Sequence, residues 1–155
     1  MNTPGIRITR YPYEEPHHLN LRITASNGRT VGDLVYYCNA NDLGVLGKKL
    51  TGFGGTRSEE VIYELGSEKP EDRFAFSLSL KVKPLDSVGH CVLTVRLNNN
   101  QAKQDKEMSE FSIKADVADL NRFGNLLEQF GRLEHRVLDW RLQDGRLIIE
   151  DEKSA

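Results

Sequence analysis

The sequence has 155 residues, of which 38% are hydrophobic and 28% charged, and its formal net charge is −2. This composition is that of one ordinary globular domain and excludes the disordered and fibrous classes. The nearly neutral charge gives no general attraction to nucleic acid or to an anionic membrane, so we expect neither as a partner.

The first element is ambiguous because alternation of apolar and polar residues is weak over residues 6–12. The segment from Tyr11 to Pro16 contains two prolines, Pro12 and Pro16, and each removes a backbone donor. We therefore expect no central strand in the segment from Tyr11 to Pro16.

A hairpin comes next. Leucine, isoleucine and alanine alternate with polar residues from Leu19 to Ala25, which predicts a half-buried strand. Asn27-Gly28 predicts a tight turn, because both residues tolerate positive φ. The return strand, from about Thr30 to Cys38, alternates imperfectly, which predicts a bulge or burial on both faces.

The first helix is predicted from an apolar stripe of Leu43, Leu46, Leu50 and Phe53, at spacings of three and four residues. We expect Asn41 or Asp42 to cap its N-terminus, since a side-chain oxygen there accepts first-turn amides. Glycines 52, 54 and 55 end it.

The middle of the chain predicts a short strand over residues 61–65, a charged loop over 67–72 and a clear strand over 73–82. In that last strand alternate residues from Phe74 to Val82 are apolar, which indicates one core face and one wet face.

The second half repeats the order of hairpin and helix. Strands are predicted from Cys91 to Leu97 and from Phe111 to Val117, followed by a helix that Asp116 or Asp119 caps. A final hairpin covers residues 137–142 and 146–149, with Asp144-Gly145 as its turn.

The two helices carry related sequences. Residues 42–54 match residues 119–131 at six of thirteen positions, and Gly47 and Gly124 are one of the identical pairs. A glycine inside a helix costs up to about 1 kcal/mol relative to alanine, so the pair indicates a close approach to a helix or sheet.

The repeat defines the predicted fold. We expect a single α+β domain over residues 1–155, with repeated β-hairpin–helix units at about 17–54 and 90–131 and a C-terminal hairpin at about 136–150. Both helices have one apolar stripe and need a sheet to cover. The prediction is a large curved antiparallel sheet with two helices packed on one face.

No set of catalytic residues is evident, so we expect no enzyme, no cofactor and no metal. Cys38 and Cys91 are predicted to be free thiols. His90 is adjacent to Cys91 in a strand, and adjacent residues point to opposite faces. The spacing of the histidines matches no zinc motif.

The residues that we single out as a candidate partner-binding site are acidic pairs in loops and nearby aromatic side chains. Charged loops favour rapid encounter with a partner of opposite charge, and tyrosine is enriched at the centres of interfaces. The set consists of Tyr11, Tyr13, Glu14, Glu15, His17, Glu59, Glu60, Glu71 and Asp72.

The N-terminal segment also carries a resemblance. The run from Ile8 to Pro16 (ITRYPYEEP), the run from His18 to Ile23 (HLNLRI), and the following order of hairpin, helix, strands, hairpin and helix resemble small bacterial WapI-type immunity proteins and related families. The resemblance covers roughly residues 6–131. It implies a non-enzymatic cytoplasmic protein that binds and blocks the catalytic domain of a secreted toxin.

Our expectation is therefore a cytoplasmic protein-binding module, with a toxin domain as its partner. The alternative is a small-molecule or sugar-binding module that uses the exposed sheet face, which predicts a deep pocket with convergent polar and aromatic groups. A homodimer formed through an edge strand is a further possibility.

Overall fold

The computed structural model describes residues 3–149, apart from the side chains of Tyr13 and Glu14. Within this range the chain forms nine strands, two α-helices and one short 3₁₀ helix, η1. In chain order they are β1 (Gly5–Glu14), β2 (His18–Ser26), β3 (Val31–Cys38), α1 (Ala40–Thr51), β4 (Val61–Gly66), η1 (Pro70–Asp72), β5 (Ser77–Pro84), β6 (His90–Asn98), β7 (Met108–Asp116), α2 (Val117–Phe130), β8 (Val137–Arg141) and β9 (Asp144–Ile148).

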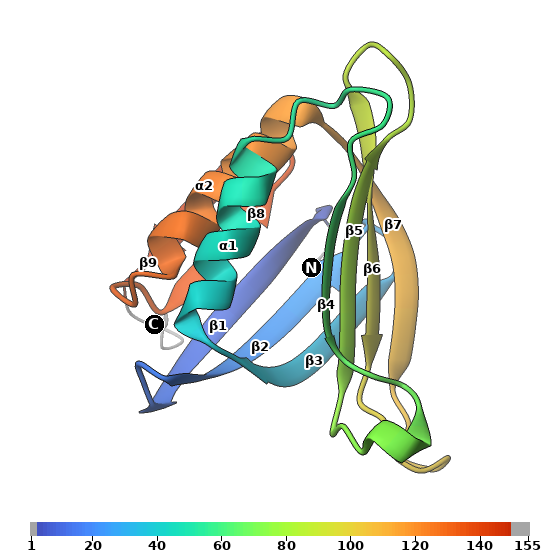
Figure 1. Cartoon of the computed structure of the whole chain (residues 1–155), viewed down its shortest axis with the longest axis vertical. Coiled ribbons are helices and arrows are strands. Elements are labelled where there is room, and N and C mark those ends of the chain that lie inside the picture. Colours follow the sequence, from blue (N-terminus) through green and yellow to red (C-terminus); the bar gives the residue numbers. More distant parts are fainter. Residues whose placement is uncertain (1–2, 150–155) are drawn as a thin grey trace.

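The α+β class and the antiparallel pairing are confirmed, but the strands form two sheets instead of one. Sheet A has the order β3-β2-β1-β8-β9 and sheet B the order β4-β5-β6-β7. Figure 1 shows sheet B along one side of the molecule and sheet A behind the two helices. The prediction of a single sheet is wrong because the four strands between the helices, β4 to β7, pair only with each other. The C-terminal hairpin, β8 and β9, instead joins the N-terminal strands.

The helices pack against each other in antiparallel directions (Figure 1). The amide of Asn121, near the start of α2, donates to the carbonyls of Leu50 and Phe53 at 2.9 Å, at the end of α1. A Cβ on Gly47 would lie 2.8 Å from the carbonyl oxygen of Gly124. The close approach predicted from this glycine pair is therefore a helix–helix contact.

Strand β1 is central over Gly5–Thr9, and the segment from Tyr11 to Pro16, where the prolines were expected to forbid a central strand, lies outside this central part. Strand β1 lies between β2 and β8 and pairs with β8 over Gly5–Thr9. Pro12 falls beyond that pairing, where the β1–β2 register shifts between Tyr11 and Glu14. A proline at such an irregularity interrupts no ladder, because its missing N–H had no regular partner there.

Both helices begin with a capping box. In α1 the N-cap lies two residues before Asn41, the earlier of the two residues predicted to cap this helix. Asn39 is its N-cap, and the Asp42 carboxylate accepts from the backbone N–H of Asn39 at 3.1 Å. Asp42 thus serves as the third helical residue of the box instead of the cap itself. In α2, Asp116 is the N-cap as expected, with Asp119 in the reciprocal position.

Two predicted boundaries shift. Strand β5 begins at Ser77, since Arg73 has φ of 55° and Phe74 lies exposed in the preceding loop. The last hairpin turns two residues before Asp144-Gly145, because Asp144 already pairs with Arg141 in the ladder. Gln143 takes the positive φ, at 65°, that the tight turn requires.

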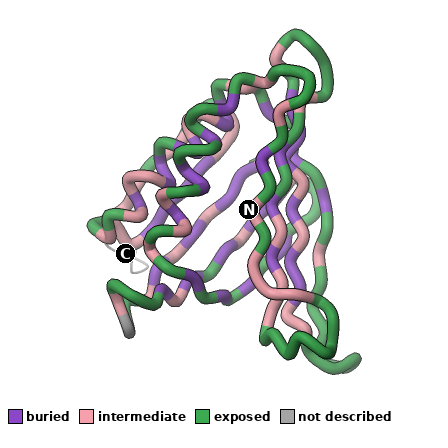
Figure 2. Tube along the Cα trace, in the orientation of Figure 1, coloured by how far each residue is buried: buried purple, intermediate pink, exposed green. Residues whose placement is uncertain are grey.

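One continuous apolar core lies between the two sheets and the helix pair. Figure 2 shows the buried residues concentrated on the inward sides of these elements. At its centre the fully buried Trp140 stacks on Phe123, with ring centroids 4.7 Å apart, and donates to the backbone carbonyl of Asp119 at 2.9 Å. In the described chain neither helix is long and apolar enough to cross a membrane.

Candidate functional site

Strand β3, at one edge of sheet A, exposes apolar side chains on the face turned away from the core. Its burial alternates without interruption and its pairing with β2 has no bulge. The imperfect alternation in the sequence arises because the solvent-facing positions are themselves apolar: Val31 and Val35 are each 50% exposed and Tyr37 43%. Bulge and two-sided burial are both excluded as its cause.

Further side chains extend this stripe across the outer face of sheet A. In the strand register Tyr37 lies opposite Asn20, which lies opposite Tyr11. His18 stacks on Tyr37 with ring centroids 5.2 Å apart. We call the resulting surface the tyrosine surface, and it consists of Tyr11, His18, Arg22, Val35 and Tyr37.

Arg22 is the charged member of this surface, and Asp33 on β3 holds it in place. Its Nε lies 3.0 Å from both carboxylate oxygens of Asp33, and Thr24 donates to the same carboxylate at 2.9 Å. The pKa of Arg22 is raised above its usual value mainly by Asp33 and further by Tyr11. The guanidinium is therefore a charged group held by Asp33 beside the side chain of Tyr11.

The acidic candidate residues do not gather into one surface. Figure 1 places the β1–β2 turn, the loop between α1 and β4, and η1 at three separate corners of the molecule. These corners hold the residues singled out from the sequence: Tyr11, Glu15 and His17 at the first, Glu59 and Glu60 at the second, and Glu71 and Asp72 at the third. Tyr13 and Glu14 have side chains outside the described part of the structure.

Two of those acidic residues have internal roles. Glu15 pairs with the buried Arg10, whose guanidinium also donates to the carbonyls of Leu133 and His135. Glu59 accepts hydrogen bonds from the N–H of Gly54 and from the hydroxyl and N–H of Thr56. These bonds lower the pKa of Glu59, and the bond from the Thr56 hydroxyl has the largest effect. Both carboxylates stabilise local structure, so fewer of their oxygen atoms are available to bind a partner.

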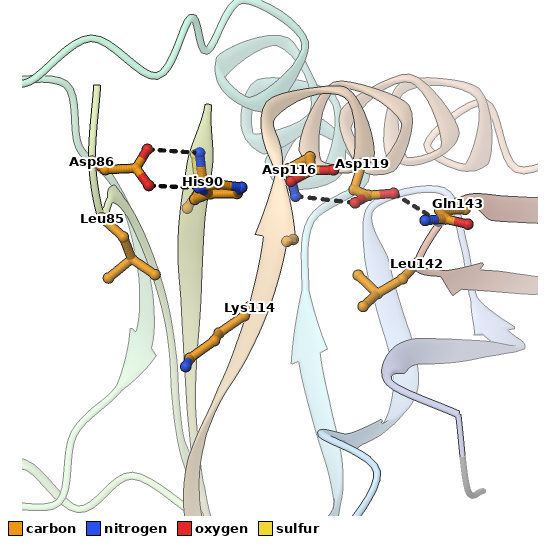
Figure 3. A pocket seen from close by; sticks show the side chains of 10 residues that line it. Leu85, Asp86, His90, Lys114, Asp116, Asp119, Leu142 and Gln143 are labelled. Atoms are coloured by element: carbon orange, nitrogen blue, oxygen red, sulfur yellow. Dashed lines mark hydrogen bonds and ion pairs between the residues drawn. The ribbon is translucent and has the colours of Figure 1, made fainter. Parts of the chain in front are cut away.

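A cavity of about 380 Å³ lies where sheet B meets α2 and the β8–β9 turn. Figure 3 shows Asp86 and His90 at one side, and Asp116, Asp119 and Gln143 at the other. His90 Nδ1 lies 2.5 Å from the Asp86 carboxylate, which lowers the pKa of Asp86 and raises that of His90.

This Asp–His pair stabilises a turn. The Asp86 carboxylate also accepts from the N–H groups of Val88 and His90, at 2.9 and 3.2 Å, and so closes the β5–β6 hairpin. The neighbouring Cys91 is buried, and burial raises the pKa of its thiol. Its hydrogen bond runs to the Gly89 carbonyl at 3.7 Å, away from the imidazole of His90.

The acidic residues on the other side of the cavity are also occupied. Although burial opposes it, hydrogen bonds from Arg122 and from the N–H groups of Asp116 and Gln143 lower the pKa of Asp119. Within residues 3–149, no three His, Cys, Asp or Glu side chains lie close enough together to hold a metal ion.

Both cysteines are free and buried, as predicted. Burial raises the pKa of the Cys38 thiol to about 12. Because the thiolate is the reactive form, neither thiol has the setting of a nucleophile.

Two further cavities, of about 510 and 490 Å³, lie beside η1 and beside the β5–β6 turn. None of these three cavities is lined by residues of β1, β2 or β3.

The sequence identified Tyr11 but missed the rest of the tyrosine surface. The signal that was present is the apolar residue at every outward position of β3 except Asp33. It was obscured because a valine in a strand is ordinarily taken as a core residue.

Comparisons with known proteins give no family. No family model and no curated protein matches the chain. A solved structure described as the plant transcriptional regulator PBF-2 aligns with 81% of this chain and 72% of its own, at 14% identity and a TM-score of 0.43.

Proposed function

We propose that this protein is a protein-binding module that docks its partner on the tyrosine surface, and that the partner is a toxin domain which it neutralises. The observation that supports docking is the exposure of Val35 and Tyr37 on an edge strand whose inward residues are all buried. The toxin partner is suggested by the resemblance to WapI-type immunity proteins.

The composition of the surface fits this role. Tyrosine and arginine are the residues that most often dominate binding energy at interfaces, because they bury a large area and also donate hydrogen bonds. Arg22 is held by Asp33 and Tyr37 by its stack on His18, so both are ordered before a partner arrives. Such preorganisation lowers the entropy cost of association.

Small-molecule or sugar binding on the exposed sheet face stays a prediction that the geometry does not favour. The cavities of 380, 510 and 490 Å³ all lie away from the outer face of sheet A. A face that lines none of these cavities and exposes the ring of Tyr37 suits a macromolecular partner better than an enclosed ligand.

The test is co-expression with toxin domains encoded beside the gene for this protein, followed by measurement of cell survival and of affinity. We expect Tyr37→Ala to weaken binding at least tenfold, since a central interface residue contributes about 2 kcal/mol or more. Phe74→Ala is the matched control, because Phe74 is similarly exposed, at 51%, but lies outside the tyrosine surface.

Two results would count against the proposal in different ways. Full protection by the Tyr37→Ala variant would show that a partner binds elsewhere. Failure of the unmodified protein to bind any of these toxin domains would remove the neutralising role.

A further inference from the structure

We propose that two copies of this chain form a dimer in which their β7 strands pair antiparallel around a twofold axis at Ser112. The two copies of sheet B then become one continuous sheet. We call this assembly the β7 dimer. The proposal does not rest on the tyrosine surface, which lies on sheet A.

Strand β7 forms an open edge of sheet B. It is the last strand in the order β4-β5-β6-β7, and it pairs with β6 over all nine residues from Met108 to Asp116 without a bulge. Figure 1 shows β7 along the margin of the molecule, with no helix or strand beyond it. A long and regular edge of this kind offers a row of backbone groups to another strand.

Two hydrogen bonds at the ends of the β6–β7 ladder show which backbone groups face the open edge. The N–H of Val117 donates to the carbonyl of Gly89 at 3.2 Å, and the N–H of Asn99 donates to the carbonyl of Glu107 at 3.0 Å. In an antiparallel ladder, residue pairs that exchange hydrogen bonds alternate with pairs that do not. The odd-numbered residues of β7 therefore bond to β6, and the even-numbered residues direct their N–H and C=O groups to the open edge.

The even-numbered residues in the middle of β7 are Glu110, Ser112 and Lys114. In the part of the chain that the structure describes, their backbone groups have no hydrogen-bond partner. The N–H of Asp116 also points away from β6, and it donates to the Asp119 carboxylate at 3.0 Å. Glu110, Ser112 and Lys114 are therefore free to exchange backbone hydrogen bonds with a second strand.

The side chains of β7 are complementary to a second copy of the same strand. An axis at Ser112 places Glu110 opposite the partner's Lys114, and Lys114 opposite the partner's Glu110. Met108 then lies opposite the partner's Asp116, so all nine residues of the strand overlap. Opposite charges that face each other across an antiparallel pair stabilise it. The dimer uses the acidic and the basic groups of this edge equally, so it requires no net charge on the sheet.

Both charged groups are available for the new contact. Lys114 is exposed and has no ion pair within the described residues. The Glu110 side chain is 49% exposed and binds Arg96 through Oε2 at 2.5 Å. The other carboxylate oxygen, Oε1, can therefore accept from the partner's Lys114.

Other registers of the same strand pair are disfavoured. An axis at Glu110 places that residue opposite its own copy, and an axis at Lys114 does the same for the lysine. An axis at Ile113 places Glu110 opposite the partner's Asp116. Like charges directly opposite each other destabilise a strand pair. The axis at Ser112 combines full overlap with two Glu–Lys pairs, which specifies one register.

The other edge strands do not match themselves in this way. A symmetric pairing of β9 brings Arg146, at the middle of the strand, opposite its own copy. A symmetric pairing of β4 places Glu64 opposite Ile62, and one of β3 places Asp33 opposite Val35. Self-association is therefore favoured at β7 over the other three edges.

The experiment measures association of the full chain by sedimentation velocity over a range of concentrations. The unmodified chain should form a concentration-dependent dimer. Lys114→Glu and Glu110→Lys each place like charges at both pairs, so either variant alone should dimerise at least about tenfold more weakly. An equimolar mixture of the two variants should recover the dimer, because opposite charges then face each other again at both pairs.

The matched control is Lys83→Glu. It makes the same charge change as Lys114→Glu on an exposed residue of β5, which lies two strands away from the open edge. Association of this variant should equal that of the unmodified chain. Circular dichroism of each variant verifies that it is folded.

A second measurement does not depend on charge, and it decides the matter if Glu110→Lys, which also takes a partner from Arg96, fails to fold. Opposite residues of a hydrogen-bonded antiparallel pair have Cα atoms about 5.5 Å apart, within reach of a disulfide. Ser112→Cys should therefore cross-link two copies under mild oxidation. Thr94→Cys, at the neighbouring position on β6, should not. The native cysteines are buried and do not compete.

Several results would overturn the proposal. One is a monomer at every concentration, and another is a dimer that both charge variants leave intact. Equal weakening by Lys83→Glu would reduce the effect to net charge, and cross-linking by Thr94→Cys in place of Ser112→Cys would move the contact away from β7. The tyrosine surface is tested separately by toxin binding, so either proposal can fail alone.

Discussion

Replacing Gly124 by alanine should destabilise the protein, whereas the same replacement at Gly44 should stabilise it. Both glycines lie inside helices, and both variants gain up to about 1 kcal/mol of helix propensity. They differ in what the new methyl group meets. At Gly124 it would contact the backbone N of Thr51 and would lie 2.6 Å from the carbonyl oxygen of Gly47, whereas at Gly44 nothing lies within 4 Å.

The magnitude follows from that difference. Backbone atoms cannot rotate away as a flexible side chain can, so α1 and α2 have to separate. Overpacking of this kind costs about 1–3 kcal/mol. Because the propensity gain is common to both variants, the gap between their unfolding free energies measures the packing cost alone. For a chain of this size it corresponds to a Tm difference of about 2–12 °C.

The assay is urea unfolding followed by tryptophan fluorescence. Trp140 is the single tryptophan of the sequence, and it is fully buried against Phe123, so its emission reports loss of the core. Equal midpoints and slopes for Gly124→Ala and Gly44→Ala would refute the helix-contact reasoning. Gly47→Ala should behave like Gly124→Ala, since its methyl group would lie 2.8 Å from the Gly124 carbonyl oxygen.

Three other predictions concern polar groups. Arg10→Met leaves Glu15 without its buried partner and should lower the unfolding free energy by about 3–5 kcal/mol, with part of the loss recovered by adding Glu15→Gln. Asp86→Asn should lower the His90 pKa towards about 6.5, as followed by NMR. The pKa of His90 is raised and that of Asp86 is lowered, so the pair stabilises the folded state fully between about pH 4 and 6.5. This stabilisation is lost as pH rises through the folded His90 pKa, and also as pH falls through the folded Asp86 pKa. Trp140→Phe removes the donor to a buried carbonyl of α2 and should cost about 1–3 kcal/mol, measured by thermal circular dichroism; an unchanged Tm would contradict that role for the indole.

Local patterns predicted most of the elements but not how the sheets assemble. The strands of both hairpins and the apolar helix stripes follow from neighbouring residues, and the structure confirms them. The chain does turn at Asn27-Gly28, but the loop spans residues 27–30, and within it only Gly28 has positive φ, at 93°. The central place of β1 does not follow from local pattern. It depends on pairing with β8, more than a hundred residues later, and the weak alternation of residues 6–12 gives no indication of that partner.

The buried Arg10 was missed for a related reason. It continues the inward series of Ile6 and Ile8, but an arginine in a weakly alternating segment is ordinarily assigned to solvent. Its partners come from the β1–β2 turn and from the loop after α2, which no sequence spacing relates.

The position of β1 also constrains synthesis. Strand β8 is synthesised long after β1, with seven strands or α-helices made between them beside β2, yet it is one of the two neighbours of the first strand. Until then β1 has an open edge, and the indole of Trp140 has not yet filled its place against α2. A nascent chain therefore completes sheet A only after β4–β7 and α2 have been made, whereas sheet B, whose strands are consecutive, can form before β8 is synthesised.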